Sequence, residues 1–144
     1  MAVDLIPEGY PVVSPYLIVG NTVELLKFIG TVFDSEELAQ THRADGSIMH
    51  AQVRLGGSII MMGETEDETR RMPGSLGVYV DDADAIYQRA IDAGAASMME
   101  PTDQFYGDRL AGVRDTNGNV WWIATHIEDV TAEEIERRAK ELNK

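Results

Sequence analysis

The sequence predicts an α+β fold made of two similar modules within one chain of 144 residues. Strand-type and helix-type hydrophobic patterns alternate along the chain. Two hairpin signals, Gly56-Gly57 and Asn117-Gly118, lie at matching places in the two halves. Val19 also matches Val80, and Val53 matches Val113, at an offset of about 60 residues. These observations together predict a repeated strand–helix–strand unit.

The first module follows an arm over residues 1–13, where Pro7, Gly9 and Pro11 interrupt any regular pattern. Its predicted elements are a strand over 16–19, a helix over 22–33, and a strand pair over 48–55 and 58–62 around the glycine turn. The apolar stripe predicted for the helix consists of Val23, Leu26, Ile29 and Phe33. Residues 63–74 are polar and lack a hydrophobic period, so we expect a linker or long loop there.

The second module repeats this order. Its predicted elements are a strand over 76–80, a helix that Asp81-Asp82 caps and that runs through Ala93, and strands over 110–115 and 120–125. The predicted helix face is Ile86, Ala90 and Ala93, and Gly94 occupies the left-handed C-terminal position. A last helix is expected over 132–142, because Thr131 and Glu134 form a capping box and Ile135, Ala139 and Leu142 make a stripe.

These patterns predict three parts of the chain. They are an arm over 1–13, a single domain over 14–130, and a C-terminal helix over 131–144. The domain comprises modules 14–64 and 75–126, joined by a loop over 65–74. Each module has room for one more strand after its helix. One helix covers only one face of such a sheet, so we expect the two uncovered faces to line a shared cleft.

Strand alternation predicts which side chains point into that cleft. In this register Leu17, Val19, Ala51 and Val53 lie under the first helix, and Trp121 and Ile123 under the second. The residues predicted to face the cleft include Tyr16, His50, Gln52, Met61, Tyr79 and Trp122. Aromatic side chains with a few polar groups are typical of a small-molecule pocket. The alternative is that these aromatic residues fill a sealed core.

Composition excludes several classes of protein. Asp and Glu number 25 against 12 Lys and Arg, which gives a net charge of −13. This charge argues against nucleic acid and anionic membranes as partners. Cysteine is absent, which removes disulfides, thiolate zinc sites and cysteine nucleophiles. The sequence shows neither a secretory signal pattern nor a long apolar run, so we expect a cytoplasmic protein.

Four segments carry a resemblance to a known family. They are Ser14-Pro15-Tyr16-Leu17, residues 45–51, residues 103–109, and residues 122–130 leading to Glu133-Glu134. Together they resemble the PhnB-like branch of the glyoxalase/bleomycin-resistance proteins, within the vicinal oxygen chelate superfamily. The resemblance implies tandem βαβββ modules that form a curved mixed sheet around a cleft, commonly in a homodimer.

The resemblance also indicates where a metal would bind. Metal-dependent members of the superfamily place His and Glu ligands at positions that fall here on Ser14, Met61, Ser75 and Trp122. Ser and Met are poor ligands for such metals, and Trp offers none. We therefore expect no metal cofactor, unless a divalent metal binds at a displaced site.

His50 is the best single candidate for a displaced ligand or an acid–base group among His42, His50 and His126. The alternative is a half-buried imidazole that is hydrogen-bonded to a neighbour. His126 is expected to anchor the start of the C-terminal segment. Tyr106 and Arg109 complete the predicted ligand-binding set. For Asp108-Arg109 the alternative is an internal ion pair that pins the loop after Tyr106.

Three functions remain open from the sequence. The first is a metal-free protein that binds or sequesters a small molecule, stacked on Trp122 and Tyr79, and the acidic charge favours a cationic ligand. The second is an enzyme, a glyoxalase-like lyase or isomerase or a dioxygenase relative, with a displaced metal or with His50 as acid–base group. The third is a structural subunit of a homodimer with a filled cleft.

Overall fold

The computed structural model describes residues 2–143 and divides into two compact units. Unit 1 contains the residues up to Gly74 together with Thr116–Gly118. Unit 2 contains Ser75–Asp115 together with the residues from Asn119 onward. Met1 of the predicted arm and Lys144 of the predicted C-terminal helix lie outside the described residues.

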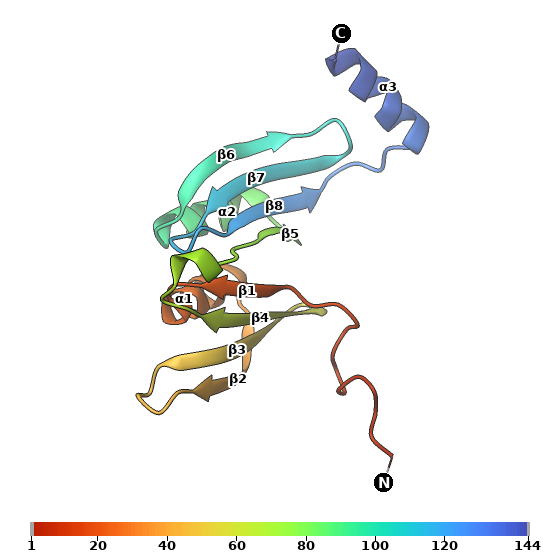
Figure 1. Ribbon diagram of the computed structural model, residues 1–144. Helices are drawn as coiled ribbons and strands as arrows, with labels where there is room; N and C mark the ends of the chain where they lie inside the picture. The colour runs from red at the N-terminus through yellow and green to blue at the C-terminus, as the bar shows by residue number, and fades with distance from the viewer. Residues whose placement is uncertain (1, 144) are drawn as a thin grey trace. The chain divides into compact units, whose positions relative to one another are not determined.

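Unit 1 holds a four-stranded mixed sheet with one helix (Figure 1). Its elements are β1 (Tyr16–Val19), α1 (Thr22–Phe33), β2 (Glu36–His42), β3 (Ile48–Leu55), β4 (Ser58–Glu64) and the short 3-10 helix η1 (Glu68–Arg70). The strand order is β1-β4-β3-β2, with β1 parallel to β4 and the other pairs antiparallel. The strand β2 fills the room that the sequence left after the helix.

Unit 2 repeats the arrangement. Its elements are β5 (Ser75–Tyr79), α2 (Ala83–Asp92), β6 (Ala96–Asp103), β7 (Asp108–Arg114), β8 (Val120–His126) and α3 (Ala132–Leu142). The strand order β5-β8-β7-β6 matches that of unit 1, and β5 is likewise parallel to β8. The predicted α+β class with tandem βαβββ modules is confirmed.

The strand register confirms the internal repeat residue by residue. Met62 pairs with Leu17 on one side and Ala51 on the other, and Ile123 pairs with Val78 and Ala111. All of these residues are buried. The face opposite each helix, which we call the open face, therefore carries the residues of the other parity, as the alternation predicted.

The helix stripes differ in part from the prediction. In α1 the buried residues are Thr22, Leu25, Phe28, Ile29 and Val32, while Val23 is 61% exposed. The sequence offers two overlapping apolar stripes. The helix buries the stripe that contains Leu25, Ile29 and Val32. This orientation agrees with the contacts of Thr22, whose backbone N–H and hydroxyl both donate to the Glu64 carboxylate, each at 3.0 Å. In α2, Ala83 and Ala90 are buried, whereas Ala93 is exposed because it is the C-cap rather than a helical residue.

The loop predicted over 63–74 is also more ordered than expected. The strand β4 extends to Glu64, and Met72 exchanges two backbone hydrogen bonds with Ile18 at the free edge of β1. Backbone pairing at an open strand edge requires no hydrophobic pattern, so this contact could not be predicted from the sequence.

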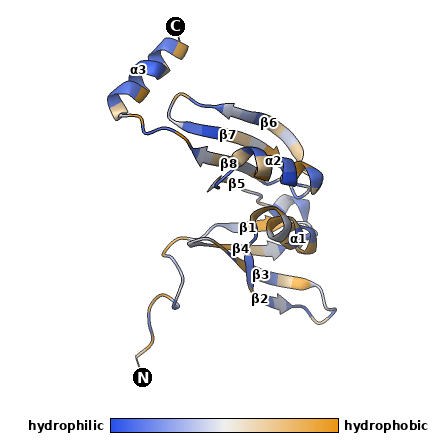
Figure 2. Cartoon of the chain, turned by 180° about the vertical axis from the view of Figure 1, so that it is seen from behind, coloured by the Kyte–Doolittle hydropathy of each residue, from blue (hydrophilic) through white to orange (hydrophobic). Residues whose placement is uncertain are grey.

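The C-terminal helix α3 begins and ends as predicted for residues 132–142, with Thr131 Oγ1 accepting from the Glu134 backbone N–H at 3.2 Å. In a complete capping box the Glu134 carboxylate would accept from the Thr131 backbone N–H. Here the carboxylate pairs with Arg137 and Arg138 instead. Figure 2 shows α3 as mostly hydrophilic with separate hydrophobic residues. Within residues 2–143, no helix is long and apolar enough to cross a membrane.

Candidate functional site

The open face of unit 2 presents the indole of Trp122, on β8, between two glycines. Gly77 of β5 and Gly112 of β7 are its direct neighbours across the sheet. The ring lies over Gly112, where an added Cβ would come within 2.5 Å of Trp122 Cζ3. Trp122 Nε1 donates to Ser75 Oγ at 3.1 Å. Backbone contact and this hydrogen bond together fix the plane of the ring.

Gly77, the neighbour of Trp122 on β5, has open space above it. A Cβ built at Gly77 would meet no atom within 4 Å. The indole itself is only partly buried. A flat aromatic surface, held in one orientation and bordered by open space, is suited to stacking against a planar molecule.

The open face of unit 1 carries a row of hydrogen-bonded polar side chains. Tyr16 Oη lies 3.0 Å from His50 Nδ1, and Gln52 Nε2 lies 2.9 Å from His50 Nε2. The Tyr10 hydroxyl donates to Gln52 Oε1. Met61 is the direct neighbour of both Tyr16 and Gln52 in the sheet. Both ring nitrogens of His50 therefore have hydrogen-bond neighbours. This arrangement matches the alternative given for His50 in the sequence analysis, an imidazole that is hydrogen-bonded to a neighbour.

A second polar cluster in unit 2 centres on Asp108, which is 5% exposed. Asp108 accepts from the Tyr79 hydroxyl at 2.6 Å and pairs with His126 Nδ1 at 2.8 Å, while His126 Nε2 faces Asp129 at 2.7 Å. Burial alone would raise the pKa of Asp108, but these hydrogen bonds lower it. The hydrogen bonds to Asp108 and Asp129 raise the pKa of His126, and the bond to Asp108 raises that of Tyr79.

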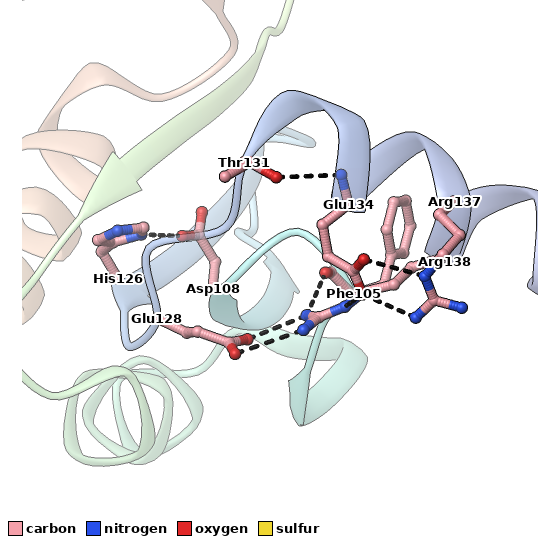
Figure 3. Close-up of polar contacts among 8 residues, drawn as sticks. All are labelled: Phe105, Asp108, His126, Glu128, Thr131, Glu134, Arg137 and Arg138. Carbon is pink, nitrogen blue, oxygen red and sulfur yellow. Dashed lines mark hydrogen bonds and ion pairs between the residues drawn. The ribbon is translucent and has the colours of Figure 1, made fainter.

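This cluster fixes the connection to α3, as expected of His126 (Figure 3). Beyond it, Arg138 donates to the Phe105 carbonyl oxygen at 3.0 Å and pairs with Glu128 at 3.0 Å. Arg137 and Arg138 lower the pKa of Glu134 to about 2. Tyr106 lies in the same loop as Phe105, with its ring edge-on to Phe105, and burial raises its pKa.

Arg109 lies on the other face of the sheet, and this corrects its predicted part in ligand binding. Its guanidinium binds Asp84 of α2 through two nitrogens, at 2.7 and 3.0 Å, and Asp103 of β6 at 2.9 Å. The alternative, an internal ion pair, is what the structure shows, with Asp84 and Asp103 as the partners of Arg109. Adjacent strand residues point to opposite faces, so Asp108 and Arg109 take different partners.

The residues present do not fit the metal site of the superfamily. The Ser75 hydroxyl accepts from the Trp122 indole, which has no lone pair to offer a metal. Ser14 and Met61 are poor donors for a divalent ion of that kind. At a displaced position, residues 2–143 contain no group of three His, Asp or Glu side chains arranged to hold a metal.

Several residues of these clusters escaped sequence reasoning. Tyr10 lies in the irregular arm, where alternation does not apply. Gly77 and Gly112 did carry a signal, because glycine inside a strand often marks a close approach of another group. The partners of Asp108 lie at the ends of β5 and β8, and local sequence patterns do not place them beside it.

Comparison with known proteins identifies the family. The family model described as "Glyoxalase/Bleomycin resistance protein/Dioxygenase superfamily" matches residues 11–123. The chain belongs to this superfamily. An uncharacterized protein of Mycobacterium bovis, Mb0911c, is 31% identical over 137 residues, which cover 88% of this chain and 90% of that protein.

Two solved structures share the fold of this superfamily chain. The PhnB protein from Bacillus cereus has a TM-score of 0.66 at 17% identity, covering 80% of this chain and 99% of that one. The fosfomycin resistance protein FosX from Listeria monocytogenes, complexed with Mn(II) and sulfate, has a TM-score of 0.64 at 16% identity and covers 90% and 97%. At these identities the likeness concerns the fold alone.

Proposed function

We propose that this superfamily member binds a planar small organic molecule non-covalently, with Trp122 as the stacking surface and without the metal site of the superfamily. The observation that carries the proposal is the seating of the indole between Gly77 and Gly112. The indole occupies the space over Gly112, and the open space over Gly77 leaves room for a second ring. Offset stacking contributes about 0.5–1.5 kcal/mol beyond the area buried.

Charge supports a cationic ligand. The chain carries a net charge of −13. An open depression of about 530 Å³ in unit 2 is lined by Tyr79, Val80, Asp81, Thr125 and His126. Tyr79 is 69% exposed and offers an aromatic face next to the acidic side chain of Asp81. Cations bind favourably over such faces, and an acidic surface attracts them over distance at low salt.

Membership of this superfamily is compatible with the binding of a small molecule. One neighbour in fold, FosX, is a fosfomycin resistance protein. A chain of the same fold without fitting metal ligands is suited to holding a small molecule rather than to metal chemistry. The homodimer and the cytoplasmic location expected from the sequence stay predictions, and size-exclusion chromatography with light scattering measures the first.

Titration with proflavine, a planar cationic dye, tests the proposal. Wild-type protein is expected to bind it saturably. Trp122→Ala should weaken binding about tenfold or more, and Trp122→Phe should retain most of it. Gly77→Val leaves the indole in place, fills the space beside it, and should block the dye. Gly30→Ala, at an exposed position on α1 with no atom near its added Cβ, is the control. Equal affinities for wild type, Trp122→Ala and Gly77→Val would refute the stacking site.

A further inference from the structure

The polar row on the open face of unit 1 is one continuous chain of hydrogen bonds. It runs from the Tyr10 hydroxyl through Gln52 and His50 to the Tyr16 hydroxyl. The chain joins the N-terminal arm to β3 and β1, which lie far apart in sequence but meet in the sheet. The members can donate or accept, so the direction of every bond depends on its neighbours.

The direction of this chain follows from Gln52. Its carboxamide oxygen accepts from Tyr10, so its nitrogen, which only donates, faces His50 Nε2. His50 Nε2 must therefore accept and carries no proton. A neutral imidazole has a single N–H, which then resides on Nδ1 and donates to Tyr16 Oη at 3.0 Å.

The hydroxyl hydrogen of Tyr16 is left without an acceptor among residues 2–143. Tyr16 is 47% exposed. Gly63 makes room for the phenol, since a Cβ there would approach Tyr16 Oη to 3.2 Å. A hydroxyl oxygen that already accepts a hydrogen bond becomes a stronger donor, because bonds in a chain polarise one another.

We infer that Tyr16 is a ligand-binding donor, held by His50 and Gln52 as positioning residues, and that it binds an acceptor oxygen of an uncharged group such as a ketone, ester or amide. The net charge of −13 disfavours anionic ligands in general. This inference goes beyond the stacking site proposed above. It concerns unit 1 alone, and its test does not depend on whether Trp122 binds a ligand.

Nitrogen NMR of the histidine rings tests the positioning half of the inference. Wild-type His50, assigned by its loss in His50→Asn, is expected as the Nδ1–H tautomer with a bare Nε2. Gln52→Glu places only acceptors opposite Nε2 and should give that nitrogen a proton, while Gln52→Leu removes the constraint. An Nε2–H tautomer in the wild-type protein would overturn the inference, because the chain would then run the other way.

Two probes of equal shape test the binding half. Acetophenone carries a carbonyl oxygen where α-methylstyrene carries a methylene group. Acetophenone is expected to bind more tightly, shifting the amide signals of Met61 and Gly63. Tyr16→Phe should weaken acetophenone binding about threefold to tenfold and leave α-methylstyrene unchanged. Tyr87→Phe, which removes a surface hydroxyl on α2, is the matched control.

The outcomes separate the two proposals. Equal binding of the two probes, no shift at Met61 and Gly63, or an unchanged ketone affinity in Tyr16→Phe would each overturn the donor role of Tyr16. None of these results bears on the proflavine titration of Trp122→Ala. Conversely, equal proflavine affinities of wild type and Trp122→Ala would refute the stacking site and would not affect the tautomer and ketone results.

Discussion

Gly112→Ala is the smallest change expected to displace the stacking surface. The added Cβ would lie 2.5 Å from Trp122 Cζ3 and 2.8 Å from Cε3. Carbon atoms pack favourably at about 3.5–4.0 Å, so the ring must retreat by about 1 Å or more. Gly112 itself lies in regular β7 and has no positive φ, so alanine fits the backbone there. The change therefore acts on the indole and not on the strand.

The magnitude follows from what the indole loses. Its retreat breaks the bond from Nε1 to Ser75 Oγ, worth about 0.5–1.5 kcal/mol, and lifts the ring from its support. Overpacking costs about 1–3 kcal/mol, and reduced freedom of the unfolded chain returns about 0.4–1 kcal/mol. Loss of aligned stacking, about 0.5–1.5 kcal/mol, corresponds to a proflavine Kd raised about threefold to tenfold.

The assay combines proflavine titration with urea unfolding of the same protein. Gly112→Ala should unfold at lower urea, remain folded in buffer, and bind the dye more weakly. Gly30→Ala provides the control, because it reports the general effect of replacing glycine with alanine. An unchanged proflavine Kd together with an unchanged indole N–H signal of Trp122 would refute the claim that Gly112 supports the ring.

Three further predictions concern the charged groups of unit 2. Arg109→Gln should lower the stability of the protein, because Asp84 and Asp103 lose their shared partner, and it should leave proflavine affinity unchanged, since Arg109 lies on the helix side; a weakened affinity in a folded variant would contradict this placement. The raised pKa of His126 means that its contribution to the free energy of unfolding is complete below the ordinary pKa of 6.5 and is lost as pH rises through the raised value. Urea unfolding from pH 6 to 9 should show this loss in the wild type and not in His126→Gln; parallel curves would argue against the cluster. Arg138→Ala should speed hydrogen exchange in α3 by removing the bonds of Arg138 to Phe105 and Glu128. Arg137 pairs with Glu134 of the same helix, so Arg137→Ala should change exchange less. Equal exchange in both variants would show that Arg138 does not hold the helix.

The sequence predicted the architecture well because local patterns and the repeat agreed. Alternation in β3 and β8 placed Ala51, Val53, Trp121 and Ile123 inside, and all four are buried. The hairpin glycines fixed the register, and the register in turn fixed which residues share each open face. The stripe of α1 was displaced because an apolar-rich helix offers more than one stripe. Tertiary contacts, including the bonds from Thr22 to Glu64, select between them.

The candidate site was predictable in its residue types and less so in its partners. Tyr16, His50, Gln52 and Trp122 do lie on open faces, as strand parity requires. Arg109 was misplaced because its predicted role rested on closeness in sequence to Asp108 rather than on parity. The support of Trp122 by Gly112 and Ser75 depends on neighbouring strands, which one sequence does not align in detail.

The indole N–H signals during a proflavine titration report directly on stacking at Trp122. The chain has two tryptophans, and each gives one such signal. Trp121 is fully buried with its Nε1 donating to Asp115 at 2.9 Å, so it serves as an internal control. If the dye stacks on Trp122, the Trp122 signal should shift saturably with Trp121 nearly unmoved. A titration that leaves Trp122 unmoved, or moves both signals alike, would contradict it.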